Sequence, residues 1–381
     1  MTRSICAAFG FFLISSAWAD DGERLLGVDH YVRVQSTVPA IAGQTTQIYV
    51  REVTRAASVL RQGSVSGRVV LFVHGAGTPG EVAFDVHYQD YSWMSYLARA
   101  GFDTFAMDMT GYGRSTRPPA MNDPCNLAQD QQKLFIPALL SAPCKPNYAD
   151  NMTTIASDWN DIGAVVDYVR GLRHVERVSL IGWSLGGPRA GGYAARNPEK
   201  VQAVVLLSPA YNRNGRLEPP AQVPAAGVAM NTQSLDEFNA NWNRQIGCPD
   251  QVDPAARQAV WSQMLDSDSV GATWGSGVRR APQVTSWGWN AAIAGKLTAP
   301  AMLVGPAHDK QVQPERVKEL FADLGSKSKA YVDLACSSHN ALWERNHALL
   351  FKASLEWLTT SSVSGAKDGV ARLGYENPAS R

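Results

Sequence analysis

The stretch VSLIGWSLGGPRAGG, residues 178–192, places Ser184 between Gly182 and Gly186 in the pattern G-x-S-x-G. A serine hydroxyl becomes a good nucleophile when a histidine removes its proton and a carboxylate orients that histidine. The serine must also be exposed, which a sharp strand-to-helix turn achieves when glycines let the two elements approach closely. The apolar run before Ser184 and the glycine-rich segment after it predict such a turn. We therefore interpret Ser184 as a nucleophile rather than an inert turn serine.

A second glycine-rich segment could stabilise the negative charge that forms when a serine attacks a carbonyl. The sequence HGAG, residues 74–77, follows the apolar run RVVLFV. Backbone N–H groups in such a loop, together with that of the residue after the nucleophile, can bind a developing oxyanion. The predicted donors are the amides of Ala76 (or Gly77) and Leu185. The alternative is that residues 74–77 form a plain glycine-rich turn.

These segments together resemble the α/β-hydrolase-fold serine hydrolases. Residues 107–115, MDMTGYGRS, add a likeness to the D-x-x-G-x-G-x-S turn of that family. The resemblance implies the chain order nucleophile, acid, histidine, which assigns the acid to Asp309 in LVGPAHD and the histidine to His339 in ACSSH. It covers nearly the whole chain after the N-terminal segment, apart from an inserted loop, a cap and a tail.

Other candidates for the base and the acid fit these roles less well. Histidines before Ser184 would break the family's order, one beside Asp309 would point away from it in an extended segment, and one falls in a predicted helix. An acid within a helix or in mid-strand is not at a strand end, as Asp309 is. The weaker candidates are His30, His74, His87, His174, His308, His347, Asp323 and Asp333.

Strands and helices alternate around these residues. Residues 31–54 are typical of an antiparallel pair of strands, and the later apolar runs are typical of strands buried on both faces of a parallel sheet. Strands are predicted within 68–77, 102–115, 177–183, 201–210, 299–309 and 329–339, and helices within 90–101, 152–172, 185–197, 314–325 and 341–358. This alternation predicts an α/β fold with a doubly wound, mostly parallel sheet.

Two segments interrupt the alternation. Residues 116–148 are rich in proline and show no clear period, whereas residues 211–298 contain amphipathic patches and five tryptophans: Trp242, Trp261, Trp274, Trp287 and Trp289. We therefore expect a core at 20–210 with a loop insert at 116–148, a helical cap at 211–298, the rest of the core at 299–360, and a disordered tail at 361–381 rich in Ser, Gly and Ala.

The N-terminus predicts export. Arg3, an apolar stretch at 5–14 and the sequence Ala17-Trp18-Ala19 have the layout of a secretory signal over residues 1–19, so the mature chain would begin at Asp20 and be secreted or periplasmic. No later segment has the length of a membrane span. The formal charge is only +1, from 35 basic and 34 acidic residues without runs of one sign, which argues against nucleic acid as a partner.

Cysteine usage agrees with export. Of five cysteines, Cys6 would leave with the signal, and four remain. We favour the pair Cys125–Cys144, because both residues lie in the proline-rich loop, and then Cys248–Cys336 by elimination. Four free thiols are the alternative if there is no signal. No cysteine or histidine spacing suggests a metal site, and no cofactor is expected.

The resemblance leaves the substrate open, because this fold hosts many reactions. A carboxylic ester or lactone, cleaved through an acyl-enzyme intermediate, is favoured by base rate. The aromatic-rich cap suggests a small substrate with an apolar or ring-bearing group. The alternatives are an amidase, a peptidase or a C–C bond hydrolase on the same residues, or a non-catalytic binding protein of the same fold.

Overall fold

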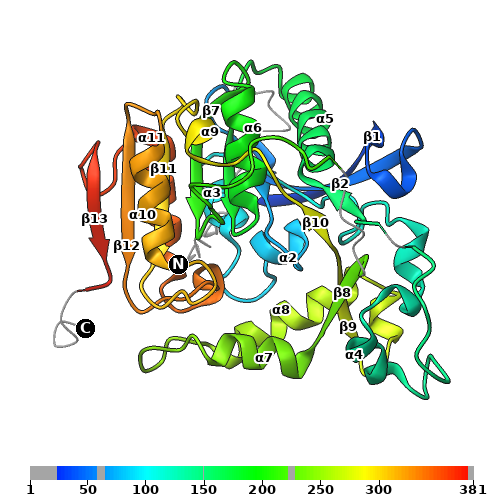
Figure 1. The fold of residues 1–381 in the computed structure, drawn as a ribbon. Helices are drawn as coiled ribbons and strands as arrows, with labels where there is room; N and C mark the ends of the chain where they lie inside the picture. The colour runs from blue at the N-terminus through cyan, green and yellow to red at the C-terminus, as the bar shows by residue number, and fades with distance from the viewer. Residues whose placement is uncertain (1–23, 58–64, 149, 222–227, 376–381) are drawn as a thin grey trace, which may run out of the picture.

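A nine-stranded sheet forms the centre of the described part of the molecule (Figure 1). The computed structural model describes residues 24–57, 65–148, 150–221 and 228–375, so the predicted signal at 1–19 and its cleavage site lie outside them. In spatial order the strands are β1 (Leu25–Gln35), β2 (Thr45–Arg55), β4 (Asp103–Met107), β3 (Val69–Val73), β6 (Val178–Trp183), β7 (Val201–Leu207), β11 (Ala301–Pro306), β12 (Lys329–Leu334) and β13 (Gly369–Leu373).

The pairing of these strands confirms the predicted fold class. The pair β1–β2 is antiparallel, as expected for residues 31–54, and β2 is also antiparallel to β4. From β4 to β13 every neighbouring pair is parallel. The carboxyl ends of these parallel strands therefore lie along one edge of the sheet, where loops from distant parts of the sequence can meet.

Helices cover both faces of the sheet and divide its interior into two apolar cores. The helices are α5 (Ile155–Arg173), α6 (Gly192–Arg196), α9 (Ala291–Ala294) and α10 (Pro314–Asp323) on one side, and α3 (Trp93–Arg99) and α11 (His347–Thr360) on the other. Alternation along β3 supplies both cores: Phe72 packs with α3 and α11, whereas Leu71 faces the opposite core. Full burial of each such side chain stabilises the fold by about 1.5–3 kcal/mol.

The tail differs from the expectation of disorder. Residues 369–373 form β13, which pairs in parallel with β12, and Ala371 and Leu373 pack against the core. The Tyr375 hydroxyl donates a hydrogen bond to Asp333 at 2.7 Å. The expectation of disorder is therefore wrong for residues 369–373, where the small polar residues before Gly369 hide a short alternating strand, and residues 376–381 lie outside the described part of the chain.

The cap is mixed rather than helical. Its helices α7 (Leu235–Asn243) and α8 (Pro254–Asp266) lie across one end of the sheet, and an antiparallel ribbon of β8 (Met230–Ser234) and β9 (Val278–Pro282) lies beside them (Figure 1). A further short strand, β10 (Val284–Thr285), pairs with β5 (Thr153–Thr154). The ribbon strands are only a few residues long, so the helical patches and tryptophans dominated the sequence pattern.

The loop insert packs on the cap ribbon. It contains short helical segments at η3 (Pro119–Asn122), η4 (Pro124–Asn126), α4 (Gln129–Gln132) and η5 (Lys133–Phe135). The predicted disulfide Cys125–Cys144 is formed, with its Cα atoms 5.3 Å apart. Met121 and Phe135 from the insert share a small core with Met230 and Trp274 from the cap. The insert and the ribbon therefore support each other through one apolar cluster.

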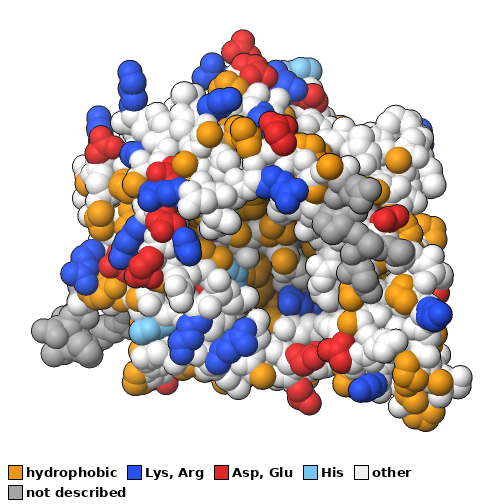
Figure 2. Space-filling model, viewed as in Figure 1, with side chains coloured by type: hydrophobic (Ala, Val, Ile, Leu, Met, Phe, Trp, Pro, Cys, Tyr) orange, Lys and Arg blue, Asp and Glu red, His pale blue; other side chains and the backbone are white. Residues whose placement is uncertain are grey.

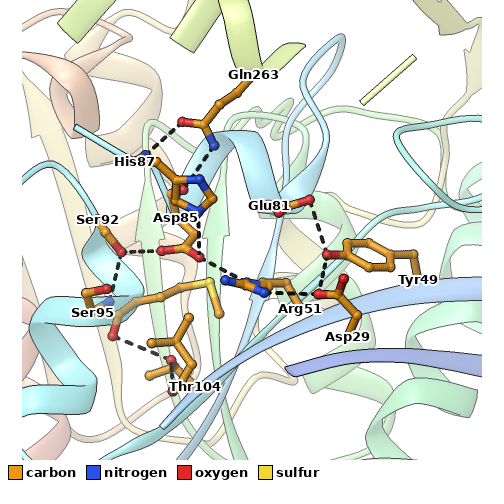
Figure 3. A network of polar contacts seen from close by, with 12 residues as sticks. Asp29, Tyr49, Arg51, Glu81, Asp85, His87, Ser92, Ser95, Thr104 and Gln263 are labelled. Carbon is orange, nitrogen blue, oxygen red and sulfur yellow. Dashed lines mark hydrogen bonds and ion pairs between the residues drawn. The ribbon is translucent and has the colours of Figure 1, made fainter. Parts of the chain in front are cut away.

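A polar network fastens the cap to the core (Figure 3). Gln263 on α8 accepts a hydrogen bond from the His87 amide (2.8 Å) and donates one to the Asp85 carbonyl (3.2 Å). The buried Asp85 carboxylate accepts from Ser92 (2.6 Å) and Arg51 (3.1 Å). Burial raises the pKa of Asp85, but hydrogen bonds from His87 and Ser92 outweigh it, so the pKa lies below its ordinary value. The cap helix is thus held by the backbone of residues 85 and 87, next to the Asp85 carboxylate.

The remaining short elements connect these layers. They are η2 (Pro39–Ile41), α2 (Gly80–Phe84), η6 (Gly187–Gly191), η7 (Gly271–Thr273) and η8 (Ala341–Trp343).

Candidate active site

Ser184 occupies a strained turn between β6 and the π-helical segment η6, which continues into α6. Its backbone φ is +57°, in the left-handed region that non-glycine residues rarely adopt. The turn is fixed by its own backbone, because the Ser184 carbonyl accepts from the amides of Gly187 (2.8 Å) and Ala210 (2.9 Å), and its amide donates to Leu207 (3.0 Å). The side chain is partly exposed. These features match the predicted strand-to-helix turn.

The glycines on either side of Ser184 permit this geometry. A Cβ atom at Gly182 would lie 2.5 Å from the Gly186 carbonyl oxygen, and one at Gly186 would lie 2.3 Å from the Val73 carbonyl oxygen. Both distances are far below van der Waals contact, so a side chain at either position would push β6, η6 and β3 apart. The G-x-S-x-G spacing is therefore a packing requirement of this turn.

Asp309 and His339 meet at the carboxyl ends of the neighbouring strands β11 and β12. His339 Nδ1 lies 2.8 Å from Asp309 Oδ2. The other carboxylate oxygen, Oδ1, accepts from the amides of Gln311 and Val312, both at 2.8 Å. Both side chains are buried, with the two residues 3% and 4% exposed. Both carboxylate oxygens are thus engaged, one by the imidazole and one by backbone amides, and Nε2 is the ring nitrogen that the carboxylate does not contact.

Ser184 and His339 line one cavity of about 110 Å³. Figure 2 shows a hollow in this face of the molecule, with hydrophobic side chains on its walls and a histidine and a basic side chain visible inside it. The cavity is lined by Ala76, Thr78, Trp183, Ser184, Phe238, Asn241, Arg279, Gln311, His339, Asn340 and Trp343. The structure therefore brings the predicted nucleophile and base to one space, with Asp309 behind the imidazole.

The weaker candidates have other partners. Asp323 on α10 binds Tyr211 (2.6 Å) and Arg213 (2.8 Å), and Asp333 on β12 accepts from Tyr375. His347 begins α11 and packs on Tyr91, with the ring centroids 4.0 Å apart. None of these three side chains is part of the cavity that Ser184 lines.

The predicted oxyanion donors come from two segments, the loop 74–77 and the turn after Ser184. Ala76 is exposed to the cavity, and Leu185 follows Ser184 in the turn. Within the described ranges, neither the Ala76 amide nor the Leu185 amide donates a hydrogen bond to another group of the protein. Unengaged amides beside a nucleophile have the property that an oxyanion hole requires.

The loop 74–77 is held by groups that the sequence pattern did not single out. The buried Arg189 donates to the carbonyls of His74 and Gly75, both at 3.0 Å, and is paired with Asp158 at 2.7 Å. His74 Nε2 accepts from the Met109 amide (3.0 Å), while Nδ1 lies 2.7 Å from the Gly75 carbonyl oxygen. Burial, then the Arg189 charge, holds the pKa of His74 well below its ordinary value, so the ring is neutral.

Asp158 reaches this position because α5 begins one turn earlier. The Thr154 hydroxyl accepts from the Ser157 amide (3.2 Å), and the Ser157 hydroxyl accepts from the Thr154 amide (3.1 Å), which makes a reciprocal cap. A sequence signal for the pair existed: Arg189 is a lone charge in a segment otherwise made of small and apolar residues.

The segment 107–115 supports the same loop from the next strand. Asp108 accepts from the amides of Gly80 (2.7 Å) and Arg114 (2.9 Å), and the Ser115 hydroxyl donates to the Asp108 carbonyl (2.6 Å). Burial raises the pKa of Asp108 to about 6. The D-x-x-G-x-G-x-S resemblance therefore marks a turn that fixes the chain just after the loop 74–77.

The loop that carries His339 is positioned by Glu344, which the sequence did not indicate. The buried Glu344 carboxylate accepts from the Ser338 amide (2.7 Å) and hydroxyl (2.5 Å), from Trp242 Nε1 (2.8 Å) and from Gln251 (3.0 Å). Burial raises the pKa of Glu344. Since Trp242 and Gln251 belong to the cap, one carboxylate joins the cap to the residue that precedes His339.

Two further contacts fix this loop. Trp183 directly precedes Ser184 in the sequence. Its ring Nε1 donates a hydrogen bond to the His339 carbonyl at 2.8 Å. The predicted disulfide Cys248–Cys336 is formed, with Cα atoms 5.8 Å apart, and links the cap to a position three residues before His339. The loop that carries His339, called the histidine loop below, is thus joined both to β6, which ends just before Ser184, and to the cap.

The cap tryptophans mostly pack rather than face a cavity. Trp242, Trp261 and Trp274 are buried in apolar clusters. Trp287 and Trp289 line a second cavity of about 330 Å³, which Leu185 also lines. A cavity with aromatic walls is therefore lined by the residue that follows Ser184.

No helix among the described residues is long and apolar enough to cross a membrane.

Comparisons with known proteins agree with this architecture. A family model described as alpha/beta hydrolase fold matches residues 68–346. A multifunctional-autoprocessing repeats-in-toxin from Vibrio vulnificus is 27% identical over 215 residues, which are 53% of this chain and 3% of the toxin. This chain therefore corresponds to only a small part of that relative.

Solved structures show the same fold at low identity. The enol-lactonase from Burkholderia xenovorans LB400 has a TM-score of 0.52 and 16% identity, with 87% of this chain and 100% of the lactonase covered. A serine hydrolase involved in carbazole degradation, the CarC enzyme, has a TM-score of 0.51 and 16% identity, with 87% and 99% covered. At this level of identity the likeness is one of fold.

Proposed function

Because the chain belongs to the alpha/beta hydrolase fold family, we propose that it is a serine hydrolase that cleaves a carboxylic ester or lactone. The observation that carries the proposal is the pairing of Asp309 with His339 at 2.8 Å beside the cavity that Ser184 lines. The strained backbone of Ser184 supports it, because such strain persists at functional turns. The choice of an ester or lactone rests on the expectation from the sequence.

In the proposed reaction, Ser184 Oγ attacks the carbonyl carbon while His339 Nε2 takes its proton. The amides of Ala76 and Leu185 stabilise the oxyanion, and Asp309 holds the imidazole in the correct tautomer. His339 then protonates the departing alkoxide, which leaves Ser184 acylated. A water molecule, deprotonated by His339, releases the acid. General-base assistance contributes about 10²–10⁴-fold and one oxyanion donor about 10²–10³-fold.

The pH dependence of this reaction follows from the base. Only a neutral imidazole can accept the proton of Ser184, so the reaction should be slower at acid pH than at neutral pH. The measurement is kcat/KM from pH 5 to 9 on an ester for which acylation limits the rate. A flat profile under that condition would count against His339 as the base.

We also propose that the protein is exported. The signal-like sequence at 1–19 and the disulfides Cys125–Cys144 and Cys248–Cys336 support this, since disulfides persist in oxidising compartments. A fusion of the N-terminal segment to a reporter that folds only outside the cytoplasm tests it.

The test of the proposed activity is labelling with a fluorophosphonate probe, which reports an activated serine without needing the right substrate. Wild type and the variants Ser184→Ala and Ser208→Ala would be compared after thermal melts show that each is folded. Ser208 is the matched control, because it also ends a strand of the sheet and has a positive φ of 46°. Labelling lost only in Ser184→Ala establishes the nucleophile.

If the folded wild type is not labelled, the chain is not an active serine hydrolase, and the reading as a binding protein replaces this proposal. If it is labelled, a panel of esters, lactones and amides identifies the bond that is cleaved. Turnover of amides but not of esters would move the assignment to an amidase.

A further inference from the structure

Arg279 enters the cavity of Ser184 from the cap. It lies on β9 and lines the same cavity as Ser184 and His339. Its guanidinium lies against the oxyanion loop, since a Cβ atom at Gly77 would be 2.5 Å from Arg279 Cζ. Arg279 Nη1 donates to the Thr78 hydroxyl at 3.2 Å. A positive charge therefore lies beside the donors proposed for the reacting carbonyl.

The fully buried arginines Arg189 and Arg280 have carboxylate partners, whereas the partly buried Arg279 has none among the described residues. The next residue, Arg280, forms two hydrogen bonds to Asp268 (2.7 and 2.8 Å), and Arg189 pairs with Asp158. No ion pair to Arg279 occurs within the described ranges, and its hydrogen bond is to a neutral hydroxyl. Arg279 is partly buried, and a guanidinium in such a cavity without an anion beside it favours an anion that arrives with the substrate.

The carboxylate of Glu237 raises the pKa of Arg279 from a distance, but the two side chains form no ion pair within the described residues. The carboxylate of Glu237 is engaged by the Ser234 amide (2.7 Å) and hydroxyl (3.0 Å) in the cap of α7. Burial lowers the pKa of Arg279 to about 10, which still leaves the side chain charged at neutral pH. The side chain is therefore a cation whose strong hydrogen-bonding directions are mostly unused.

Neighbouring side chains suit a carboxylate as well. Asn241 from α7, together with Gln311 and Asn340 from the loops that carry Asp309 and His339, lines the same cavity. Amide groups donate to carboxylate oxygens, and a guanidinium binds a carboxylate through paired N–H donors. The volume of about 110 Å³ leaves room for only a small group beside the reacting carbonyl.

We propose that the natural substrate carries a carboxylate close to the ester or lactone bond, and that Arg279 binds this carboxylate. This inference rests on the proposed function and specifies its substrate class: the half-ester of a dicarboxylic acid, a carboxylated lactone, or an ester of a hydroxy acid. It replaces, for this cavity, the expectation of a purely apolar or ring-bearing substrate.

The test uses two pairs of esters that differ in charge and little in shape. For the acyl side, mono-p-nitrophenyl succinate is compared with p-nitrophenyl levulinate, in which a methyl ketone replaces the carboxylate. For the alcohol side, 4-carboxyphenyl acetate is compared with 4-acetylphenyl acetate. The quantity measured is the ratio of kcat/KM for the charged ester to kcat/KM for its neutral partner. The ratio cancels any general loss of activity in a variant.

We expect the wild type to prefer the charged ester in at least one pair, and Arg279→Gln to lower that ratio by about tenfold to a hundredfold, as for loss of a charged hydrogen bond. Arg279→Lys, which keeps the charge, should retain part of the preference. Arg316→Gln removes a surface arginine outside the cavity and is the matched control for net charge. The pair that responds identifies the side of the bond that bears the carboxylate.

The inference is overturned if the wild type shows no preference in either pair. It is also overturned if Arg279→Gln lowers kcat/KM equally for the charged and the neutral ester, because Arg279 would then only support the loop 74–77. If Arg279→Gln does not fold, competitive inhibition of the wild type by succinate but not by succinamide supports the inference, and equal inhibition overturns it. Fluorophosphonate labelling of the wild type separates the two proposals, because it tests Ser184 without any carboxylate.

Discussion

The two sides of the cavity are built in different ways. On the core side, Ser184, Asp309 and His339 follow β6, β11 and β12, three parallel strands of one sheet. On the cap side, Arg279 lies on a two-stranded ribbon that is not part of the nine-stranded sheet, and Asn241 lies on α7. The sheet thus fixes the residues proposed for bond cleavage, and the cap adds a charge that selects among substrates.

Two of the links between these sides reach the loop that carries His339. Glu344 accepts hydrogen bonds from Trp242 and Gln251 of the cap and from Ser338 of the histidine loop, and the disulfide Cys248–Cys336 joins the same two regions covalently. The comparison therefore predicts that changes on the core side abolish activity, changes in the links weaken it, and changes at the far edge of the cap affect stability alone.

The largest effect is expected from Asp309→Asn. The amide would no longer hold His339 in the tautomer that accepts a proton from Ser184, so kcat should fall by about 10⁴-fold with little change in fold. The measurement is kcat on the best ester found in the panel. Asp323→Asn on α10 is the control and should keep activity, because Asp323 pairs with Arg213 away from the cavity. Equal losses in both variants would contradict the role of Asp309.

Removal of the second disulfide should come next. The double variant Cys248→Ser/Cys336→Ser opens a loop with a sequence separation of 88 residues, and a loss of about 2–4 kcal/mol of unfolding free energy is expected. Activity should fall too, because the disulfide tethers the loop of His339 to the cap. Chemical denaturation and kcat/KM measure the two effects.

The first disulfide is the matched control. Cys125→Ser/Cys144→Ser opens a separation of 19 residues within the loop insert and should also lower stability. This disulfide joins two residues of the loop insert and does not contact the histidine loop. The value of kcat/KM should therefore stay near that of the wild type below the melting temperature. If both double variants lose the same activity, the second disulfide has no special coupling to the site.

A smaller loss is expected from Glu344→Gln. The glutamine side chain has the same shape as glutamate, but its N–H₂ group would face N–H or O–H groups that donate to a carboxylate oxygen in the wild type. The expected loss of unfolding free energy is about 1–3 kcal/mol. The displaced Ser338 should shift His339, so the rate of fluorophosphonate labelling should fall as well. Glu319→Gln, which removes a surface carboxylate paired with Arg316, is the control. Loss of stability without slower labelling would mean that Glu344 only supports packing.

The smallest effect concerns pH and the network in Figure 3. A hydrogen bond to Asp85 raises the pKa of His87 in the folded protein. A raised pKa means that this pair stabilises the fold below the ordinary histidine pKa, about 6.5, and that the contribution is lost as pH rises through the folded pKa. His87 is largely exposed, so the expected contribution is about 0.5 kcal/mol or less.

His87→Ala should therefore lower the melting temperature more at pH 5.5 than at pH 8.5. Activity measured well below the melting temperature should be the same in His87→Ala and wild type, because no labelled residue of this network lines the cavity of Ser184. An equal effect of the substitution at the two pH values would show that the imidazole charge contributes nothing to the attachment of the cap.

The core side could be predicted from the sequence because its signals are local. Ser184 has a glycine at each flank, and Asp309 and His339 follow apolar runs that can be recognised as strands. The structure places Asp309 and His339 in contact and gives Ser184 the expected turn. The sheet class followed from the same apolar runs, whereas Cys125–Cys144 was predicted from a shared loop and Cys248–Cys336 by elimination.

The supporting residues could not be predicted because their partners are distant in sequence. Glu344 and Trp242 are 102 residues apart, and Arg279 and Thr78 are 201 apart. Each charged residue alone resembles a surface residue, and nothing in a single sequence distinguishes Arg280, which has a carboxylate partner, from Arg279, which lacks one. The short strands β9 and β13 were missed for a related reason, since their pattern is shorter than that of a typical element.

The separation of the ribbon β8–β9 from the main sheet has a consequence for how this enzyme architecture can diversify. Because no ladder of hydrogen bonds among the described strands joins the ribbon to the nine-stranded sheet, a substitution on β9 should leave unchanged the register of the strands that precede Ser184, Asp309 and His339. One position facing the cavity can then change its charge by point mutation while the bond-cleaving apparatus is inherited intact. Directed evolution of this chain should begin at that ribbon.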